Sequence, residues 1–568
     1  MTTTTPPPGT EQRPASEEAH PRPGWRRLIP RWRYGYVGTV AAAAFFCLSL
    51  TPSLLPRGYL FQGLISGLLA AIGYGAGVLA VWLAVQMSRR PLPRPTPVAW
   101  RSLAVLTAVP TAVLLILGAR WQHDIHRLMG LDPPPRLGFI LVLPTAVAIG
   151  AGFVGMARLL RRVAQRLAAL LGRWIPAATA RVLAGAVVVA LLLGLLNGVV
   201  LRAAFAAADG AFRTLNEETQ PDIAAPVEAL RSGGPQSLIS WASLGNQGRT
   251  FISGGPGPAQ LARFGGPGAR SPIRVYAGLD SAPTSRQRAE LTVRELQRTG
   301  AFQRSVLCLI TTTGTGWVNE QAVDPLEYMY HGDTALAAMQ YSYLPSPISF
   351  IVDKDRAREA GRDLFDQVYG VWSRLPRESR PKLLIFGESL GSFGAEAAFS
   401  GIDDIRNRTD GMLLVGPPNR NELWSGYVFD RDRGSPEILP VVEQGSAVRF
   451  AAVPADLDGP ATPWDSPRVI YLQYPSDPIT WWSPQLMVRR PDWLTEPRGS
   501  DVLPSMRWYP FVTFWQVSAD MAFANDVPPG HGHNFGAMPV MAWARIAPPE
   551  GWTVSRTDEL TRLIADGG

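Results

Sequence analysis

The sequence predicts an α/β fold in its second half, preceded by a bundle of about five transmembrane helices. Three observations support this. Apolar runs long enough to cross a bilayer fill most of residues 34–205. After residue 271, short apolar runs alternate with amphipathic helical segments, which is typical of a mostly parallel sheet covered by helices. Within that second half, a Gly-x-Ser-x-Gly pentapeptide joins a strand-like run to an Ala-rich run. Together they indicate an α/β-hydrolase-type domain behind a membrane anchor.

Composition divides the chain into four predicted segments. Residues 1–33 form a disordered basic tail, 34–205 a transmembrane helical domain, 206–270 a linker or adapter, and 271–568 a catalytic α/β domain. The first 206 residues hold 21 Lys and Arg against 5 Asp and Glu, whereas the remainder holds 33 against 41. Because the excess of basic residues lies between apolar runs, it does not indicate a nucleic-acid partner.

Five apolar runs are the predicted membrane spans, at residues 34–55, 60–87, 102–119, 137–160 and 182–200. A cleaved signal peptide is the alternative for the first run. Arginines cluster before the first run, between the second and third, and between the fourth and fifth, so these segments are expected in the cytoplasm. An odd number of spans then puts the α/β domain outside the cytoplasm. Pro110 interrupts the third run, and losing that span would reverse this orientation.

Ser389 is the predicted nucleophile. Residues 382–386 read as a buried strand and 392–400 as a helix, and the pentapeptide between them describes a nucleophile elbow. A serine hydroxyl attacks well only when it stands clear of its backbone, near a base and near donors for the oxyanion. A serine in an ordinary strand-to-helix turn is the alternative.

The base should follow the nucleophile in the chain, and only His531 and His533 do so. Two residues apart in a turn-rich loop, they are expected to point to opposite sides, so that one of them faces Ser389. We favour His533, because it lies nearer the apolar segment that could hold it, and keep His531 as the alternative.

Asp477 is the predicted acid, because it lies in a turn just after the strand-like run 469–472. An aspartate there can reach the far nitrogen of the imidazole and fix its tautomer. Its alternative role is to close the turn before Pro478. Asp520 is the reserve candidate.

The oxyanion would be stabilised by the amide of Leu390 and by a Gly-rich loop after the apolar run 305–311, with Thr312, Thr313 and Gly314 as candidates. Phosphate binding is the competing interpretation of that loop, although no Lys follows it. His123 and His126 could share one helical face as metal ligands, or form an interfacial turn. No third ligand lies near them, and no metal or organic cofactor is expected.

Five motifs in this architecture resemble the actinobacterial membrane-bound α/β-hydrolase family, also called α/β-hydrolase family 9. They are Thr313-Gly-Thr-Gly-Trp317, Arg380-Pro-Lys-Leu383, Gly387-Glu-Ser-Leu-Gly-Ser392, Gly416-Pro-Pro418 and Gly530-His-Gly-His533. The resemblance covers nearly everything after the tail. It implies the architecture and the serine chemistry, but no particular substrate.

The sequence therefore predicts an integral, multi-pass cell-membrane protein that acts as a serine hydrolase, cleaving an acyl ester outside the cytoplasm. Its expected partners are the lipid bilayer and an acyl ester or lipid-like substrate, since the domain is tethered to a bilayer and Trp481 and Trp482 lie close to Asp477. An acyltransferase that passes the same acyl group to a lipid or sugar is one alternative. A membrane scaffold without catalysis is the other.

Overall fold

The computed structural model describes residues 35–88, 95–194, 212–345, 354–446 and 448–567, together with residues 2, 93, 348 and 349. Two parts of the predicted organisation lie largely outside this range. These are the tail at 1–33 and the stretch from the end of the fifth apolar run into the start of the linker, at 195–211.

The α/β domain is built on one seven-stranded sheet in which every neighbouring pair is parallel, in the order β1-β3-β2-β4-β5-β7-β6. Its strands are β1 (Ile273–Ala277), β2 (Val306–Thr311), β3 (Thr334–Met339), β4 (Lys382–Glu388), β5 (Gly411–Val415), β6 (Val448–Ala451) and β7 (Arg468–Leu472). Nearly every strand residue is buried, as expected for a parallel sheet covered on both faces. The predicted fold class is confirmed.

Two groups of helices cover the sheet. In one group, α12 (Lys354–Trp372) packs against both α9 (Ser285–Thr299) and α13 (Leu390–Glu396). In the other, α18 (Met538–Ile546) packs against α10 (Glu320–Met329) and α19 (Val554–Ala565). Strand β4 is the fourth of the seven strands. The segment that follows it therefore begins near the middle of the sheet, at the end where the parallel strands have their carboxyl termini.

The described part of the predicted linker, residues 212–270, folds onto this domain. It contains α7 (Gly245–Ser253) and α8 (Pro258–Gly265), whose residues Phe251, Ile252 and Leu261 are buried in the same core as the sheet. Leu244 and Ile239 join that core. The described part of this segment therefore packs on the α/β domain.

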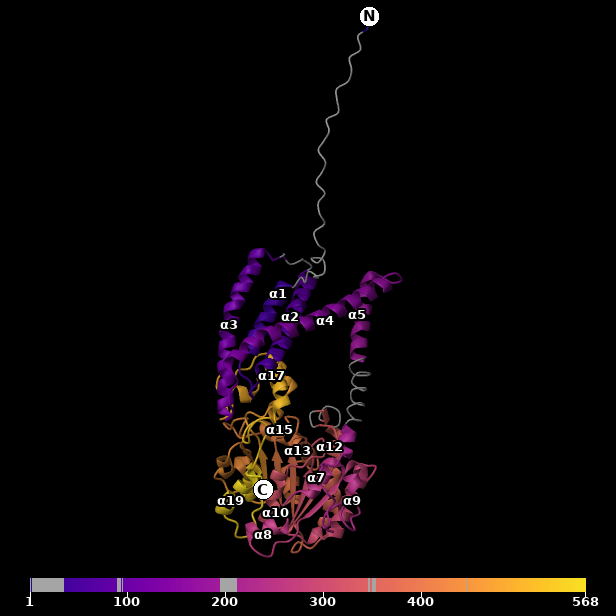
Figure 1. Cartoon of the computed structure of the whole chain (residues 1–568), viewed down its shortest axis with the longest axis vertical. Coiled ribbons are helices and arrows are strands. Elements are labelled where there is room, and N and C mark those ends of the chain that lie inside the picture. Colours follow the sequence, from indigo (N-terminus) through magenta and orange to yellow (C-terminus); the bar gives the residue numbers. More distant parts are fainter. Residues whose placement is uncertain are drawn as a thin grey trace.

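The N-terminal region consists of α1 (Tyr36–Ser49), α2 (Tyr59–Ser88), α3 (Pro97–Leu128), α4 (Val142–Leu171) and α5 (Ala177–Gly194), which rise above the α/β domain (Figure 1). Three segments among the described residues are long and apolar enough to cross a membrane: α2, α3, and the stretch Arg136–Leu171 that contains α4. The described parts of α1 and α5 are shorter apolar helices. The region thus fits a membrane protein, but the predicted count of five spans is not confirmed.

Glycines on α2 let neighbouring helices approach closely. A Cβ on Gly73 would lie 2.7 Å from the Ala41 carbonyl of α1, and one on Gly67 would lie 2.7 Å from the Ala146 carbonyl of α4. This small-residue packing is what holds helices together where lipid removes the hydrophobic driving force.

The turn between α1 and α2 lies against the α/β domain. Arg57 makes a buried ion pair with Asp520 at 2.8 Å, and Asp520 also accepts from the Ser53 hydroxyl and the Leu54 amide. Asp520 ends α17 (Val512–Asp520), which Figure 1 shows between the long helices and the sheet. The two halves of the chain are therefore joined by a polar contact enclosed in apolar surroundings.

Candidate active site

Ser389 sits at the sharp turn between β4 and α13, with φ 54° and ψ −125°. This conformation is strained for a residue with a side chain. The glycines at either side of the turn relieve crowding. A Cβ on Gly387 would lie 2.6 Å from the Gly391 carbonyl, and a Cβ on Gly391 would lie 2.2 Å from the Thr311 carbonyl at the end of β2. The pentapeptide thus forms an elbow that only glycine at both positions permits.

The backbone of the elbow is fixed on both sides. The Ser389 amide donates to the Val415 carbonyl at the end of β5 at 2.8 Å, and the Ser389 carbonyl accepts from the amide and the hydroxyl of Ser392. Strain of this kind persists only when its surroundings enforce it. The hydrogen bonds around Ser389 therefore fix the turn at the carboxyl end of β4.

The C-terminal loop brings His533 to Asp477. Nδ1 of His533 lies 2.7 Å from Oδ2 of Asp477, and both side chains are buried. The same carboxylate accepts from the Ile479 amide and the Thr480 hydroxyl. Asp477 therefore closes the turn before Pro478 and also binds the imidazole, while its role as the catalytic acid stays a prediction.

Gly416 places the imidazole beside the elbow. A Cβ on Gly416, whose φ is +55°, would lie 2.3 Å from Cε1 of His533. Gly416 directly follows Val415, to which the Ser389 amide is bonded. Phe535 makes an edge-to-face contact with the ring, at 5.6 Å between ring centroids, and its Cε2 lies 3.0 Å from the same ideal Cβ of Gly416.

The electrostatics favour a charged imidazole. Burial alone would lower the pKa of His533, but the Asp477 carboxylate, through its charge and its hydrogen bond, and the charge of Glu388 raise it above the usual value for histidine. Within the described part of the chain, Nε2 of His533 is buried and has no hydrogen-bond partner. One nitrogen is thus committed to the acid, and the other is available to a reacting group.

Comparison with family models supplies the classification. Residues 273–560 match the model of an α/β-hydrolase family, and residues 50–256 match the model of the N-terminal region of that family. The chain belongs to this α/β-hydrolase family. Neither a curated protein nor a solved structure matches the chain. The two matched segments cover α2 to α5, the first part of the segment before β1, and nearly all of the α/β domain, so both halves of the chain match models of one family.

In this α/β-hydrolase, the candidate oxyanion loop lies against the elbow. The ideal Cβ of Gly391 would be 3.0 Å from the Thr312 carbonyl, which puts the start of α13 against the end of β2. The Thr313 amide donates to the Trp317 carbonyl at 3.1 Å, so it is engaged within its own turn. Gly314 lies in that same turn. The amides of Leu390, Thr312 and Gly314 stay predicted oxyanion donors.

The other predicted candidates have different partners in the α/β-hydrolase. His531 lies beside Asp501, with 3.6 Å between Nδ1 and Oδ2. The carboxylate of Asp520, the reserve acid, is bound by Arg57, Ser53 and the Leu54 amide. On α3, Nδ1 of His126 lies 2.6 Å from the Gln122 carbonyl. Among the described residues, no group of three or more His, Cys, Asp or Glu side chains is arranged to hold a metal ion.

Glu388, next to the nucleophile, is a site residue that the sequence analysis missed. It is buried, and one of its carboxylate oxygens accepts from the Asn319 side chain at 2.8 Å. Burial raises the pKa of Glu388, while the charge of His533 and the bond from Asn319 oppose that rise. The position inside the pentapeptide could have drawn attention to it. Asn319, 69 positions earlier in the chain, carried no such signal.

Proposed function

We propose that this protein is a membrane-anchored serine hydrolase that cleaves an acyl ester. Ser389 attacks the ester carbonyl, His533 takes the serine proton and returns it to the leaving alcohol, and Asp477 orients the imidazole. The acyl-enzyme is then hydrolysed by a water that the same histidine activates. The amides of Leu390 and Thr312 donate to the oxyanion.

One observation carries the proposal: the hydrogen bond between His533 and Asp477, formed beside a serine in an elbow turn. A buried carboxylate that binds Nδ1 fixes the tautomer in which Nε2 can accept a proton. The carboxylate also stabilises the imidazolium that forms when the serine is deprotonated, which agrees with the raised pKa of His533. Structural histidines need no such arrangement next to a strained serine.

Covalent labelling tests the proposal directly. The intact protein in detergent should react with a fluorophosphonate probe, and Ser389→Ala should abolish the reaction. Ser392→Ala is the matched control, because Ser392 lies one turn further on and its hydroxyl is engaged, donating to the Ser389 carbonyl and accepting from the Asn421 side chain. If the folded wild-type protein does not label, or if Ser389→Ala labels as well as wild type, the serine mechanism is wrong.

Product analysis then distinguishes hydrolysis from transfer. With a lipid ester and water alone, we expect free acid to appear in proportion to the alcohol released. If the acyl group were recovered only on an added lipid or sugar alcohol, the protein would be an acyltransferase with the same nucleophile.

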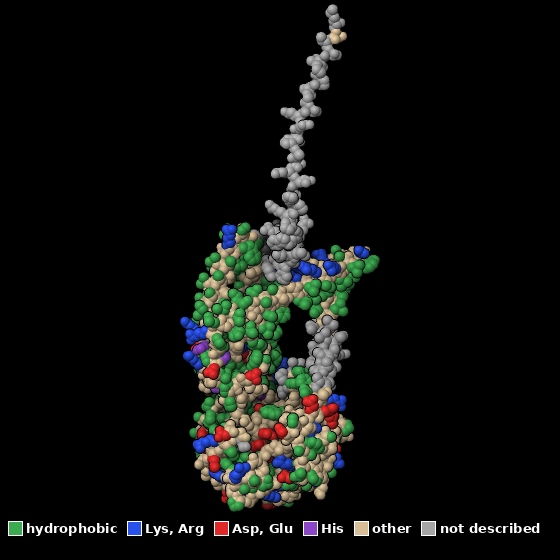
Figure 2. Space-filling view, viewed as in Figure 1, with side chains coloured by type: hydrophobic (Ala, Val, Ile, Leu, Met, Phe, Trp, Pro, Cys, Tyr) green, Lys and Arg blue, Asp and Glu red, His purple; other side chains and the backbone are tan. Residues whose placement is uncertain are grey.

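Orientation is the last part of the proposal: the α/β domain faces outward from the cytoplasm. The distribution of arginine supports it, because the loops rich in arginine join the helix ends that point away from that domain (Figure 2). A protease added to intact cells should cleave sites after residue 211. Complete protection of these sites, with cleavage restored by permeabilisation, would place the domain inside.

A further inference from the structure

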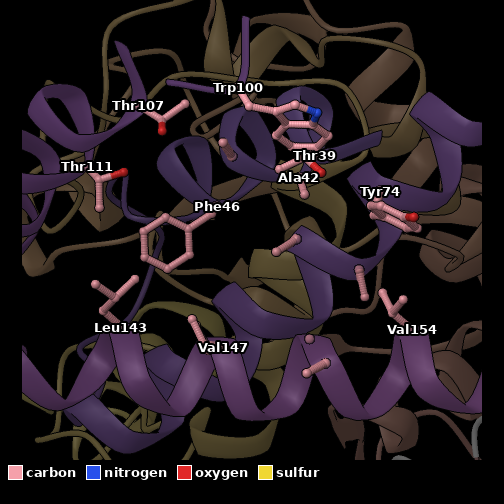
Figure 3. Close-up of a pocket in the computed structure, with 16 residues that line it drawn as sticks. Thr39, Ala42, Phe46, Tyr74, Trp100, Thr107, Thr111, Leu143, Val147 and Val154 are labelled. Carbon is pink, nitrogen blue, oxygen red and sulfur yellow. The ribbon is translucent and has the colours of Figure 1, made fainter. Parts of the chain in front are cut away.

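An apolar cavity of about 380 Å³ lies among helices α1, α2, α3 and α4, away from the candidate active site (Figure 3). Phe46, Trp100 and Val147 are among its lining residues, and most of the others are alanine or another small or aliphatic residue. Two of its three threonines have their hydroxyls engaged by backbone: Thr39 donates to the Gly35 carbonyl and Thr107 to the Leu103 carbonyl. The cavity therefore suits a hydrocarbon chain.

A second cavity, of about 550 Å³, adjoins the first between α2 and α4. The two share Ala71, Tyr74 and Val154 as lining residues. Unlike the first, this cavity has a basic end, because Arg158 and Arg161 of α4 line it. The apolar cavity and the cavity with the basic end thus share part of their wall.

Tyr74 marks the boundary between the two. Its hydroxyl accepts from the Gly35 amide at 3.1 Å and lies 3.5 Å from Nη2 of Arg158. Gly35 directly precedes α1, so the arginines lie near the end of the helical region that points away from the α/β domain. At that end of candidate membrane-spanning helices, lipid headgroups would meet the protein and acyl chains would run toward the first cavity.

We infer that these two cavities form one binding site for an anionic phospholipid. Arg158 and Arg161 bind the phosphate, Tyr74 lies beside it, and one acyl chain occupies the cavity lined by Phe46 and Val147. Charge complementarity decides the class of lipid: two guanidinium groups at the mouth favour a headgroup with net negative charge over a zwitterionic one. The site does not depend on the chemistry proposed at Ser389.

Native mass spectrometry of the full-length protein in mild detergent tests this site. The probes are dioleoyl phosphatidylglycerol and dioleoyl phosphatidylcholine, which share acyl chains and differ in headgroup. We expect the wild type to retain phosphatidylglycerol about thirtyfold better, which corresponds to about 2 kcal/mol, the attraction of two basic side chains to an anionic lipid surface. Arg158→Gln combined with Arg161→Gln should reduce this preference to near unity.

Two further variants separate the headgroup from the chain. Arg166→Gln, on the same helix but outside both cavities, should keep the wild-type preference. Ala71→Phe should weaken binding of both lipids, because Ala71 lines both cavities. The glutamine variants remove charge without changing the apolar packing, so they remain informative if Ala71→Phe fails to fold.

Three outcomes would overturn the inference. Equal retention of the two lipids by wild type would show that the arginines do not select a headgroup. An unchanged preference in the double glutamine variant would place the selectivity elsewhere. Displacement of phosphatidylglycerol by millimolar inorganic phosphate, with phosphate bound as tightly, would identify a site for the free anion.

Discussion

The α/β domain and the helical region use apolar residues in opposite ways. In the domain most of them are enclosed, and even the guanidinium of Arg274 is fully buried against Glu327 and Asp324. In the helical region large apolar side chains face outward, as with Leu106, which is 71% exposed, and Figure 2 shows this apolar surface. Catalysis in the domain should therefore depend on a few enclosed polar groups. The stability of the helical region should instead depend on close packing of helix backbones.

The largest effect should come from the imidazoles. Replacing His533 by Ala removes the proposed base, and we expect kcat to fall by about 10⁴-fold or more. His531→Ala, the matched control two positions away, should keep most of the activity, because His531 lies beside Asp501. Ester hydrolysis by each purified variant measures both. The opposite ranking would exchange the roles of the two histidines.

Asp477→Asn should reduce kcat by about 10³ to 10⁴-fold and also change the pH profile. Activity requires neutral His533, so in the wild type it is lost as the pH falls through the raised pKa of that group. Without the carboxylate charge the pKa of His533 falls, and the acid limb of kcat/KM should move to lower pH. A limb that does not move would mean that another group titrates.

A change at the ion pair between Arg57 and Asp520, which joins the helical region to the α/β domain, should destabilise both regions. Arg57→Met leaves Asp520 buried without its ion-pair partner, which costs about 3–5 kcal/mol. Combining it with Asp520→Leu should recover much of the loss, because the buried charge is removed as well. Thermal unfolding in detergent measures this cycle. Additive losses in the double variant would show that the two charges are not coupled.

The smallest expected effect is a loss of stability caused by a change within the helical region alone. A methyl group on Gly77 would lie 2.7 Å from the Val37 carbonyl, so Gly77→Ala must push α1 from α2, at a cost of about 1–3 kcal/mol. Gly75, on the same helix, has nothing within 4 Å of its ideal Cβ, and Gly75→Ala should be close to neutral. Equal melting temperatures for the two variants would show that the close contact between α1 and α2 contributes little.

Much of the sheet could be predicted from local sequence. The run 273–277 corresponds to β1, and the run followed by Gly-x-Ser-x-Gly corresponds to β4. Strand β3 escaped prediction because Thr334–Met339 is rich in alanine, which favours helices, and only its pairing with β1 and β2 on either side makes it a strand. The four-residue β6 was too short to stand out.

The order of residues along the chain was enough to predict part of the candidate site. The fold's order of serine, acid and histidine pointed to Asp477 and His533, which the structure brings together. Gly416 appeared only as part of a motif, although its missing Cβ makes room for the imidazole. The pairing of Arg57 with Asp520, 463 positions apart, left no trace in local pattern, because nothing near either residue indicates its partner.

The turn between α1 and α2 also reaches the histidine loop itself. Leu55 is fully buried, and its Cδ2 lies 3.4 Å from the position of a Cβ on Gly532, the residue before His533. A fragment that contains only the chain after residue 211 would lack Leu55, which packs on the histidine loop. It would also leave the Asp520 carboxylate without Arg57. Such a fragment should be difficult to produce in soluble form, and biochemists who seek activity should keep the protein whole.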